Sequence, residues 1–152
     1  MNDANRLALH SVDAAADNPL LPLLEAQRAA FLKVGPTSYE HRIAALKRLR
    51  QAVVDHHQQI LDAVDADFGH RSRHETFFAD VIGLLGEIRH TRKHLRKWMR
   101  PRRAGWSPQF PLAKARIHYQ PRGVIGIIGP WNVPVLLTLS PLIGAIAAGN
   151  RA

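Results

Sequence analysis

The sequence predicts an α/β fold, in which N-terminal helices are followed by the first strand–helix unit of a doubly wound sheet. Three observations lead to this prediction. Apolar residues recur every three to four positions through most of residues 38–100, the period of helices with one buried face. Residues 124–128 form a short apolar run rich in β-branched side chains, as in buried strands. A turn with two prolines then joins this run to an apolar, helix-like segment over residues 135–148.

Length and composition set the first limits. A chain of 152 residues is long enough for one domain with a hydrophobic core. The chain contains no cysteine, which excludes disulfides, thiolate metal sites and cysteine nucleophiles within it. Residues 1–18 mix polar, charged and small side chains and do not resemble a secretory signal. We therefore expect a loose N-terminal tail over 1–18 and a cytoplasmic protein.

Two helices are expected after the tail. The first covers residues 19–34 and ends at the glycine–proline pair that follows it. The second covers residues 38–67, and Thr37 with Glu40 has the spacing of a capping box at its start. Its expected apolar stripe consists of Ile43, Leu46, Leu49, Val53, Ile60, Leu61 and Val64.

A third, longer helix is expected over residues 74–100. Ser72 and Glu75 form a second possible capping box before it, and Pro101 ends it. The segment 101–112 contains three prolines and is expected to be a loop, followed by a short strand over 115–119. The expected apolar stripe of the helix over 74–100 consists of Phe78, Val81, Leu84, Leu85, Ile88, Leu95 and Trp98.

Charge is distributed unevenly along the chain. Residues 1–87 hold nine Lys and Arg against twelve Asp and Glu, whereas residues 88–152 hold twelve Lys and Arg and no acidic residue. Eight of these basic residues lie between Arg89 and Arg103, a cluster that would suit a nucleic acid or an anionic membrane. Their helical spacing favours a solvated helix face, or a face covered by acidic groups, and we expect no nucleic-acid partner.

The histidines suggest a metal site only weakly. His70 and His74, and likewise His90 and His94, are four residues apart, a spacing that would suit metal ligands on a helix. However, His90 and His94 lie in the basic cluster without acidic neighbours, and His70 precedes the expected helix. We expect no metal ion.

The uncharged run over residues 123–150 allows a second interpretation, a small basic membrane-associated protein with one span at 123–150. This run is 28 residues long, whereas a bilayer core requires about 20 apolar residues in a helix. Against a span, Pro130, Pro134 and Pro141 each remove a backbone donor, and Asn132 adds a polar amide. A buried strand followed by a buried helix explains the run better, and no stable membrane span is expected.

The turn over residues 130–134 is the candidate functional site. In an open α/β sheet, a turn that joins a strand to a helix is where chemistry is placed, and we expect Trp131 and Asn132 to be buried there. The two flanking prolines would fix the backbone and aim the Asn132 amide at one point, as a donor to a developing oxyanion requires. The residues alone leave a second role open for Asn132, that of a helix N-cap, and a core-packing role for Trp131.

The sequence closely resembles the aldehyde dehydrogenase superfamily. The resemblance rests on QPRGVIGIIGPWNVP at residues 120–134 and on PLIGAIAAGN at residues 141–150. The segments RSRHET at 71–76 and GEIRH at 86–90 resemble the coniferyl-aldehyde dehydrogenase branch. Two residues depart from the common pattern, namely Arg122, where Leu is frequent, and Val133, where an aromatic residue is frequent.

The resemblance implies a function for this part of the chain. It implies NAD- or NADP-dependent oxidation of an aldehyde, such as coniferyl or another aromatic aldehyde, to its carboxylic acid, by a homodimer. Asn132 matches the oxyanion donor of the family. Ile128, Gly129, Pro130 and Trp131, together with Asn132, match residues that contact the cofactor.

The resemblance also implies a domain organisation. A helical region over 19–112 would precede the start of a Rossmann-like NAD(P)-binding domain over 113–152, in an incomplete aldehyde dehydrogenase fold. The nucleophilic cysteine and the general-base glutamate of the family would follow Ala152. We therefore expect a truncated N-terminal part that is inactive by itself, and the sequence does not distinguish a natural truncation from a frameshift or a fragment.

Overall fold

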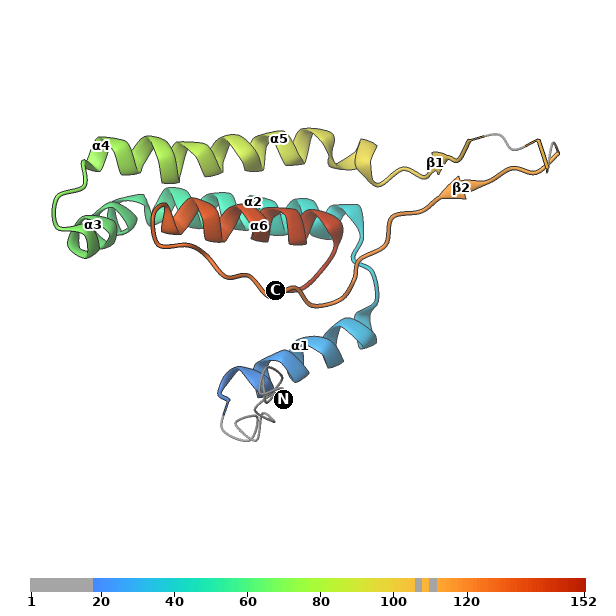
Figure 1. Cartoon of the computed structure of the whole chain (residues 1–152), viewed down its shortest axis with the longest axis horizontal. Coiled ribbons are helices and arrows are strands. Elements are labelled where there is room, and N and C mark those ends of the chain that lie inside the picture. The colour runs from blue at the N-terminus through green and yellow to red at the C-terminus, as the bar shows by residue number, and fades with distance from the viewer. Residues whose placement is uncertain (1–17, 106–107, 110–111) are drawn as a thin grey trace, which may run out of the picture.

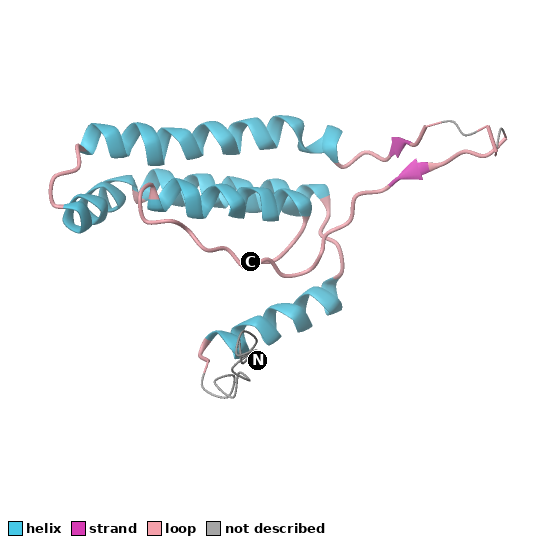
Figure 2. Ribbon diagram, viewed as in Figure 1, coloured by secondary structure: helices cyan, strands magenta, loops and turns pink. Residues whose placement is uncertain are grey.

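The computed structural model describes residues 18–105, 108–109 and 112–152, and most of them form helices or the connections between helices (Figures 1 and 2). The expected tail, residues 1–18, therefore lies outside the described residues except for Asn18. In chain order the elements are α1 (Leu20–Val34), α2 (Tyr39–Asp55), α3 (His57–Phe68), α4 (Arg73–Thr76), the π-helical turn η2 (Phe77–Ile82), α5 (Gly83–Trp98), β1 (Arg102–Arg103), β2 (Arg116–Ile117) and α6 (Pro134–Ala148).

The hydrophobic core lies where α2, η2, α5 and α6 meet. Figure 1 shows α5 running along α2 and α6, with α1 set apart and the β1–β2 hairpin projecting from one end. Burial of apolar side chains between these helices removes them from water and is the main contribution to their packing. The buried cluster consists of Leu46, Val53, Val81, Leu84, Ile88, Leu95, Ile143 and Ala147.

Helix α1 makes few contacts with this core, and none of its residues is buried. Phe31 lies beside Gly123, and the Gln27 side chain accepts a hydrogen bond from Arg151 (3.1 Å). Most of its leucines face solvent; Leu32, for example, is 82% exposed. The apolar residues of α1 thus contribute little to the packing seen here.

The expected helix over 38–67 is wrong in one respect, because it is two helices, α2 and α3. The break lies at His56, which has non-helical backbone angles. The Nδ1 atoms of His56 and His57 contact the carbonyls of Ala52 (2.9 Å) and Val54 (2.8 Å). Side-chain contacts of this kind compete with the regular helical ladder and allow the chain to turn.

The expected helix over 74–100 is confirmed as the continuous series α4, η2 and α5. Its apolar stripe is wrong at both ends, because Phe78 is 68% exposed and Trp98 is 45% exposed, whereas the neighbouring Phe77 packs against the core. A π turn carries more residues per turn than an α-helix, so the spacing counted along α5 does not continue to Phe78. Ser72 is the N-cap residue, but its side chain makes no capping hydrogen bond.

The start of α2 also differs from the expected capping box. Ser38, not Thr37, is the N-cap, and its hydroxyl accepts a hydrogen bond from the His41 amide (3.2 Å). Thr37 is instead a partner of the buried Arg42, whose Nε donates to the Thr37 carbonyl (3.0 Å) and hydroxyl (3.2 Å). Arg42 also donates to the Ala147 carbonyl (2.9 Å), which links α2 to the last turn of α6. Burial lowers the pKa of Arg42.

The expected strand over 115–119 is present as β2, shorter than expected. It pairs in an antiparallel manner with β1, where Arg102 lies opposite Ile117 and Arg103 opposite Arg116. Strand β1 was not expected, because the three prolines of residues 101–112 indicated only a loop. A hairpin with two residues in each strand has only marginal stability by itself.

In the part of the chain that the structure describes, the expected strand over 124–128 is reduced to its first residue, whereas the incomplete α/β fold class is confirmed. Only Val124 pairs there, in a single parallel bridge with Arg151. Two backbone hydrogen bonds hold the bridge, from the Ile125 amide to the Arg151 carbonyl (2.8 Å) and from the Arg151 amide to the Gly123 carbonyl (2.8 Å). A strand requires a neighbour along its length, and in the described ranges only Arg151 provides one.

The interpretation of residues 123–150 as a membrane span is not supported. Irregular backbone occupies most of 125–133, and the helix that follows, α6, has 15 residues. Such a helix is about 22 Å long, shorter than the roughly 30 Å hydrocarbon core of a bilayer. None of the helices in the described ranges is both long and apolar enough to cross a membrane.

Candidate functional site

The turn that carries the candidate site lies at the start of α6. Pro134 is the first residue of the helix, a position that proline suits because its missing N–H would have no helical partner. The N-cap is Val133, whose side chain cannot cap. The role of Asn132 as N-cap is therefore wrong, and the first amides of α6 need another acceptor.

The expectation of a buried turn is also wrong. Asn132 is exposed, Trp131 is 80% exposed and Ile128 is 97% exposed, and Gly129 and Pro130 are exposed as well. Trp131 is likewise outside the hydrophobic core that the described residues form. Ile128, Gly129, Pro130, Trp131 and Asn132 thus form one continuous accessible segment.

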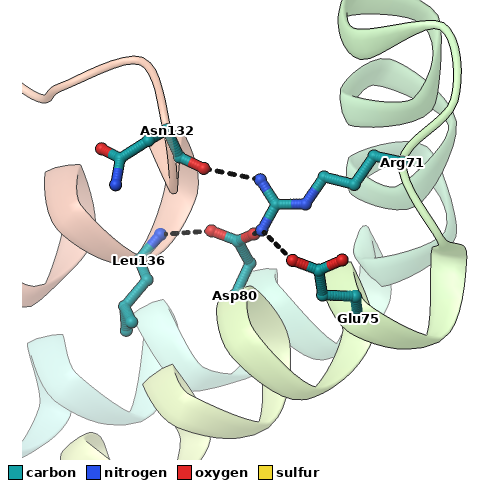
Figure 3. A network of polar contacts seen from close by, with 5 residues as sticks. All are labelled: Arg71, Glu75, Asp80, Asn132 and Leu136. Atoms are coloured by element: carbon teal, nitrogen blue, oxygen red, sulfur yellow. Dashed lines mark hydrogen bonds and ion pairs between the residues drawn. The ribbon is translucent and has the colours of Figure 1, made fainter.

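The missing cap of α6 is supplied by Asp80, which lies on η2. Its side chain is fully buried, and its Oδ1 atom accepts a hydrogen bond from the Leu136 amide (2.8 Å) (Figure 3). Leu136 is the third residue of α6, where a helix has an unpaired N–H group. A carboxylate at this end also interacts favourably with the helix dipole. The cap therefore comes from a different helix rather than from the turn itself.

Arg71 fixes the other end of the turn. One terminal nitrogen donates a hydrogen bond to the backbone carbonyl of Asn132 (2.7 Å), and the other lies 3.7 Å from Oδ2 of Asp80 (Figure 3). The second nitrogen also lies 3.8 Å from Glu75, whose side chain is 66% exposed. The Arg71 side chain is only 7% exposed, so this pair is largely shielded from water. Arg71 and Asp80 together hold both ends of the segment from Asn132 to Leu136.

The aromatic rings of Phe68 and Trp131 add contacts around Arg71 and the turn. The guanidinium of Arg71 lies 5.0 Å from the centre of the Phe68 ring, within the range of a cation–π contact. The Phe68 ring in turn lies 6.3 Å from the ring of Trp131. The end of α3 therefore contacts both Arg71 and the turn that Arg71 holds.

Gly129 allows the turn to lie against α6. A Cβ atom at this position would overlap the hydroxyl oxygen of Thr138 and lie 3.1 Å from its Cβ. A side chain at residue 129 would therefore push the exposed segment away from the helix. Glycine therefore suits the close approach of residue 129 to α6.

The other end of α6 is tied to the segment that leads into the turn. Gly149 ends the helix with a φ of 85°, a conformation that favours glycine. Asn150 follows, and its Oδ1 accepts hydrogen bonds from the amides of Arg122 (2.6 Å) and Gly123 (3.0 Å). Residues 122–150 thus form a loop and helix that are held at both ends.

This arrangement leaves the Asn132 amide available for chemistry. Its backbone carbonyl is held by Arg71, whereas its side chain forms no hydrogen bond within the described ranges. The backbone of Asn132 is therefore anchored, while its carboxamide is free to donate a hydrogen bond to a ligand oxygen.

The histidines do not form a comparable site. The rings of His90 and His94 lie side by side, with centres 4.2 Å apart, and Trp98 continues the stack. His70 precedes α4, which contains His74. In the described part of the chain, no three His, Cys, Asp or Glu side chains lie close enough together to hold a metal ion.

Sequence reasoning missed Arg71 and Asp80. The signal was present at Asp80, the only charged residue between Phe77 and Leu85. A charge in the apolar stretch of an amphipathic helix indicates a buried, paired group, because burial of an unpaired charge is costly. The partner was not recognisable, because Arg71 lies in a loop outside any periodic pattern.

Comparisons with known proteins agree with these observations. The family model described as "Aldehyde dehydrogenase family" matches residues 1–152. A probable coniferyl aldehyde dehydrogenase of Caulobacter vibrioides is 47% identical over 133 residues, which cover 86% of this chain and 27% of that protein. A coniferyl aldehyde dehydrogenase of Pseudomonas sp. is 42% identical and covers 85% of this chain and 26% of that protein.

A solved structure shows the same likeness in three dimensions. The substrate-bound state of AldH from Staphylococcus aureus superposes with a TM-score of 0.81 and 29% sequence identity, over 88% of this chain and 29% of that chain. The present chain therefore spans about a quarter of the length of the relatives that it matches.

Proposed function

The chain belongs to the aldehyde dehydrogenase family and corresponds to an N-terminal part of its relatives, and we propose that it serves an NAD(P)-dependent enzyme that oxidises an aldehyde to its carboxylic acid. We further propose coniferyl aldehyde or another aromatic aldehyde as the substrate, because the names of two relatives refer to coniferyl aldehyde. Both proposals concern the complete enzyme, of which this chain supplies one part.

The observation that supports this function best is the anchored turn at Asn132. When a nucleophile attacks an aldehyde carbonyl, negative charge develops on the oxygen. A hydrogen-bond donor that is already in place stabilises this charge without reorganisation. We assign this role to the Asn132 side chain, because its amide is exposed while its backbone is held by Arg71.

The exposed segment beside Asn132 is the proposed cofactor contact. The family generally uses NAD or NADP, and we propose that Ile128, Gly129, Pro130 and Trp131, together with Asn132, would hold this group. The segment fits such a role, because it is accessible and Gly129 keeps it close to α6. When bound, the nicotinamide ring accepts the hydride that the substrate loses.

The catalytic nucleophile is not in this chain. It contains no cysteine, and the resemblance places the thiolate and the glutamate that activates water beyond Ala152. We therefore propose that the purified 152-residue chain has no dehydrogenase activity. Reduction of NAD or NADP with coniferyl aldehyde or benzaldehyde, above a blank without protein, would contradict this.

Assembly and location are proposed for the complete enzyme. We propose a homodimer in the cytoplasm, with no nucleic-acid partner. The β1–β2 hairpin supports the dimer, because it projects from the helices in Figure 1 and has only two residues in each strand. Such a hairpin gains stability when another chain covers it.

A hybrid enzyme tests the proposed function. Residues 1–152 replace the corresponding segment of the Caulobacter vibrioides relative, and the resulting protein is called the hybrid enzyme below. We expect it to form NADH or NADPH and a carboxylic acid from coniferyl aldehyde. A hybrid enzyme that folds, as shown by a cooperative thermal transition, but has no turnover would contradict the proposal.

A further inference from the structure

We propose that Arg71 and Asp80 are positioning residues for catalysis, which set the direction in which the Asn132 amide points. This inference rests on the proposed oxyanion role of Asn132. It assigns a function to two side chains that lie outside the motif of residues 120–150 and that touch only the backbone of the turn (Figure 3).

The contacts act on the two ends of a short segment. Arg71 holds the carbonyl of Asn132 at 2.7 Å, and Asp80 holds the amide of Leu136 at 2.8 Å. A fixed carbonyl at Asn132 restricts rotation of its peptide plane, and a fixed amide four residues later restricts the first turn of α6. The Asn132 side chain makes no hydrogen bond of its own within the described ranges, so this backbone sets the position of its Cβ atom and the directions open to its amide.

The two anchors also depend on each other. Asp80 is fully buried and Arg71 is 7% exposed, and their nearest charged atoms are 3.7 Å apart. An isolated buried charge is costly, so each side chain makes the other's position more favourable. Loss of either is therefore expected to release both ends of the turn rather than one.

The buried position distinguishes this pair from the ion pair beside it. Arg73 forms a salt bridge with Asp62 (2.6 Å), but both side chains are substantially exposed, at 41% and 58%. Exposed ion pairs of this kind contribute little to the stability of the fold. Arg73 and Arg71 are two residues apart, so the same substitution at each gives a matched comparison.

The experiment is a double-mutant cycle in the hybrid enzyme. We expect Arg71→Met to lower kcat by about tenfold to a hundredfold, because a small displacement of a catalytic group has effects of this size. The Kd for NAD(P) is expected to change less than kcat, because Ile128, Gly129, Pro130 and Trp131 still contact the cofactor when the direction of Asn132 changes. Arg73→Met is the control and should leave kcat unchanged.

The decisive measurement is Arg71→Met in an Asn132→Ala background. If Arg71 acts through Asn132, its substitution has almost no further effect on kcat once the amide is absent. If the two effects multiply, Arg71 acts in another way and the proposal is overturned. An Arg71→Met enzyme with unchanged kcat overturns it as well.

Three further variants separate positioning from folding. Asp80→Asn keeps an oxygen that accepts from Leu136, and it should retain more activity than Asp80→Ala; equal losses would contradict the inference. If Arg71→Met does not fold, Arg71→Lys takes its place in the cycle. It is expected to lower kcat in the hybrid enzyme and to have almost no further effect in the Asn132→Ala background. If Asn132→Ala alone leaves kcat unchanged, the proposed oxyanion role itself fails, a result that is distinct from failure of Arg71→Met alone.

Discussion

At the scale of single residues, the site depends on side chains that act on backbone groups. Arg71 and Asp80 hold the ends of the turn, Asn150 holds the amides of Arg122 and Gly123, and Arg42 holds a carbonyl in the last turn of α6. Each of these side chains supplies a hydrogen-bond partner to a backbone group that would otherwise bond to water. The position of the Asn132 side chain is therefore a consequence of contacts made by other residues.

Gly129 gives a prediction at this scale. A methyl group at residue 129 would overlap the Thr138 hydroxyl, and overpacking of this kind costs about 1–3 kcal/mol. We expect Gly129→Ala to lower the free energy of unfolding of the chain by that amount in urea titrations. Gly126→Ala is the matched control, because a Cβ atom there meets nothing within 4 Å. Equal losses in the free energy of unfolding for the two substitutions would contradict the close approach of residue 129 to Thr138.

At the scale of elements, most of the helices were predictable, whereas the expected strand over 124–128 was found, within the described ranges, only at Val124. Helix periodicity is local, so Leu46, Leu84 and Ile88 could be assigned to a buried face from spacing alone. The apolar run over 124–128 indicated a strand, but a strand requires a partner, and in the described part of the chain only Arg151 pairs with it. The run's composition gave no information about that partner.

The site was predictable only in part, for a related reason. The motif and the resemblance led to Asn132 and its neighbours, but the expectation that the turn is buried was wrong. Arg71 and Asp80 are far from the turn in sequence and near it in space, so neither composition nor spacing could connect them. The break at His56 and the π turn η2 are likewise local changes in the backbone that the spacing of apolar residues does not indicate.

The π turn gives a prediction at the element scale. Leu84 is fully buried on α5, whereas Phe78 on η2 is 68% exposed, although the sequence places both on one stripe. Leu84→Ala is expected to lower the free energy of unfolding by about 2–5 kcal/mol, because it leaves a cavity. Phe78→Ala should change it by less than about 1 kcal/mol. A larger loss at Phe78 than at Leu84 in the same denaturation experiment would contradict the observed register.

At the scale of the whole molecule, the chain forms one shared helical core that includes α6. Helix α6 packs against α2 and α5, although the predicted domain boundary at residue 112 lies between them. The division into regions 19–112 and 113–152 stays a prediction. The turn that carries Asn132 is thus attached to the helical region through α6, Arg71 and Asp80.

The basic cluster gives a prediction for the whole molecule. Arg89, Arg96 and Lys97 are exposed on α5, and Arg96 lies over the ring of Tyr39 (4.6 Å). We expect this surface to bind nucleic acid no more tightly than a typical non-specific complex, with a Kd of about 10⁻⁶ M or weaker at physiological salt. Filter-binding titrations with single- and double-stranded DNA at several salt concentrations measure this. A submicromolar Kd at physiological salt would show that the cluster has a nucleic-acid partner.

The most direct test of the central claim is the effect of Asn132→Ala on the first turnover of the hybrid enzyme. If Asn132 stabilises the developing oxyanion, the rate of NADH or NADPH formation in that turnover, measured at saturating cofactor, falls by about 10²–10³. A rate within about twofold of the unsubstituted hybrid enzyme would contradict the account and leave the anchored turn without a catalytic role.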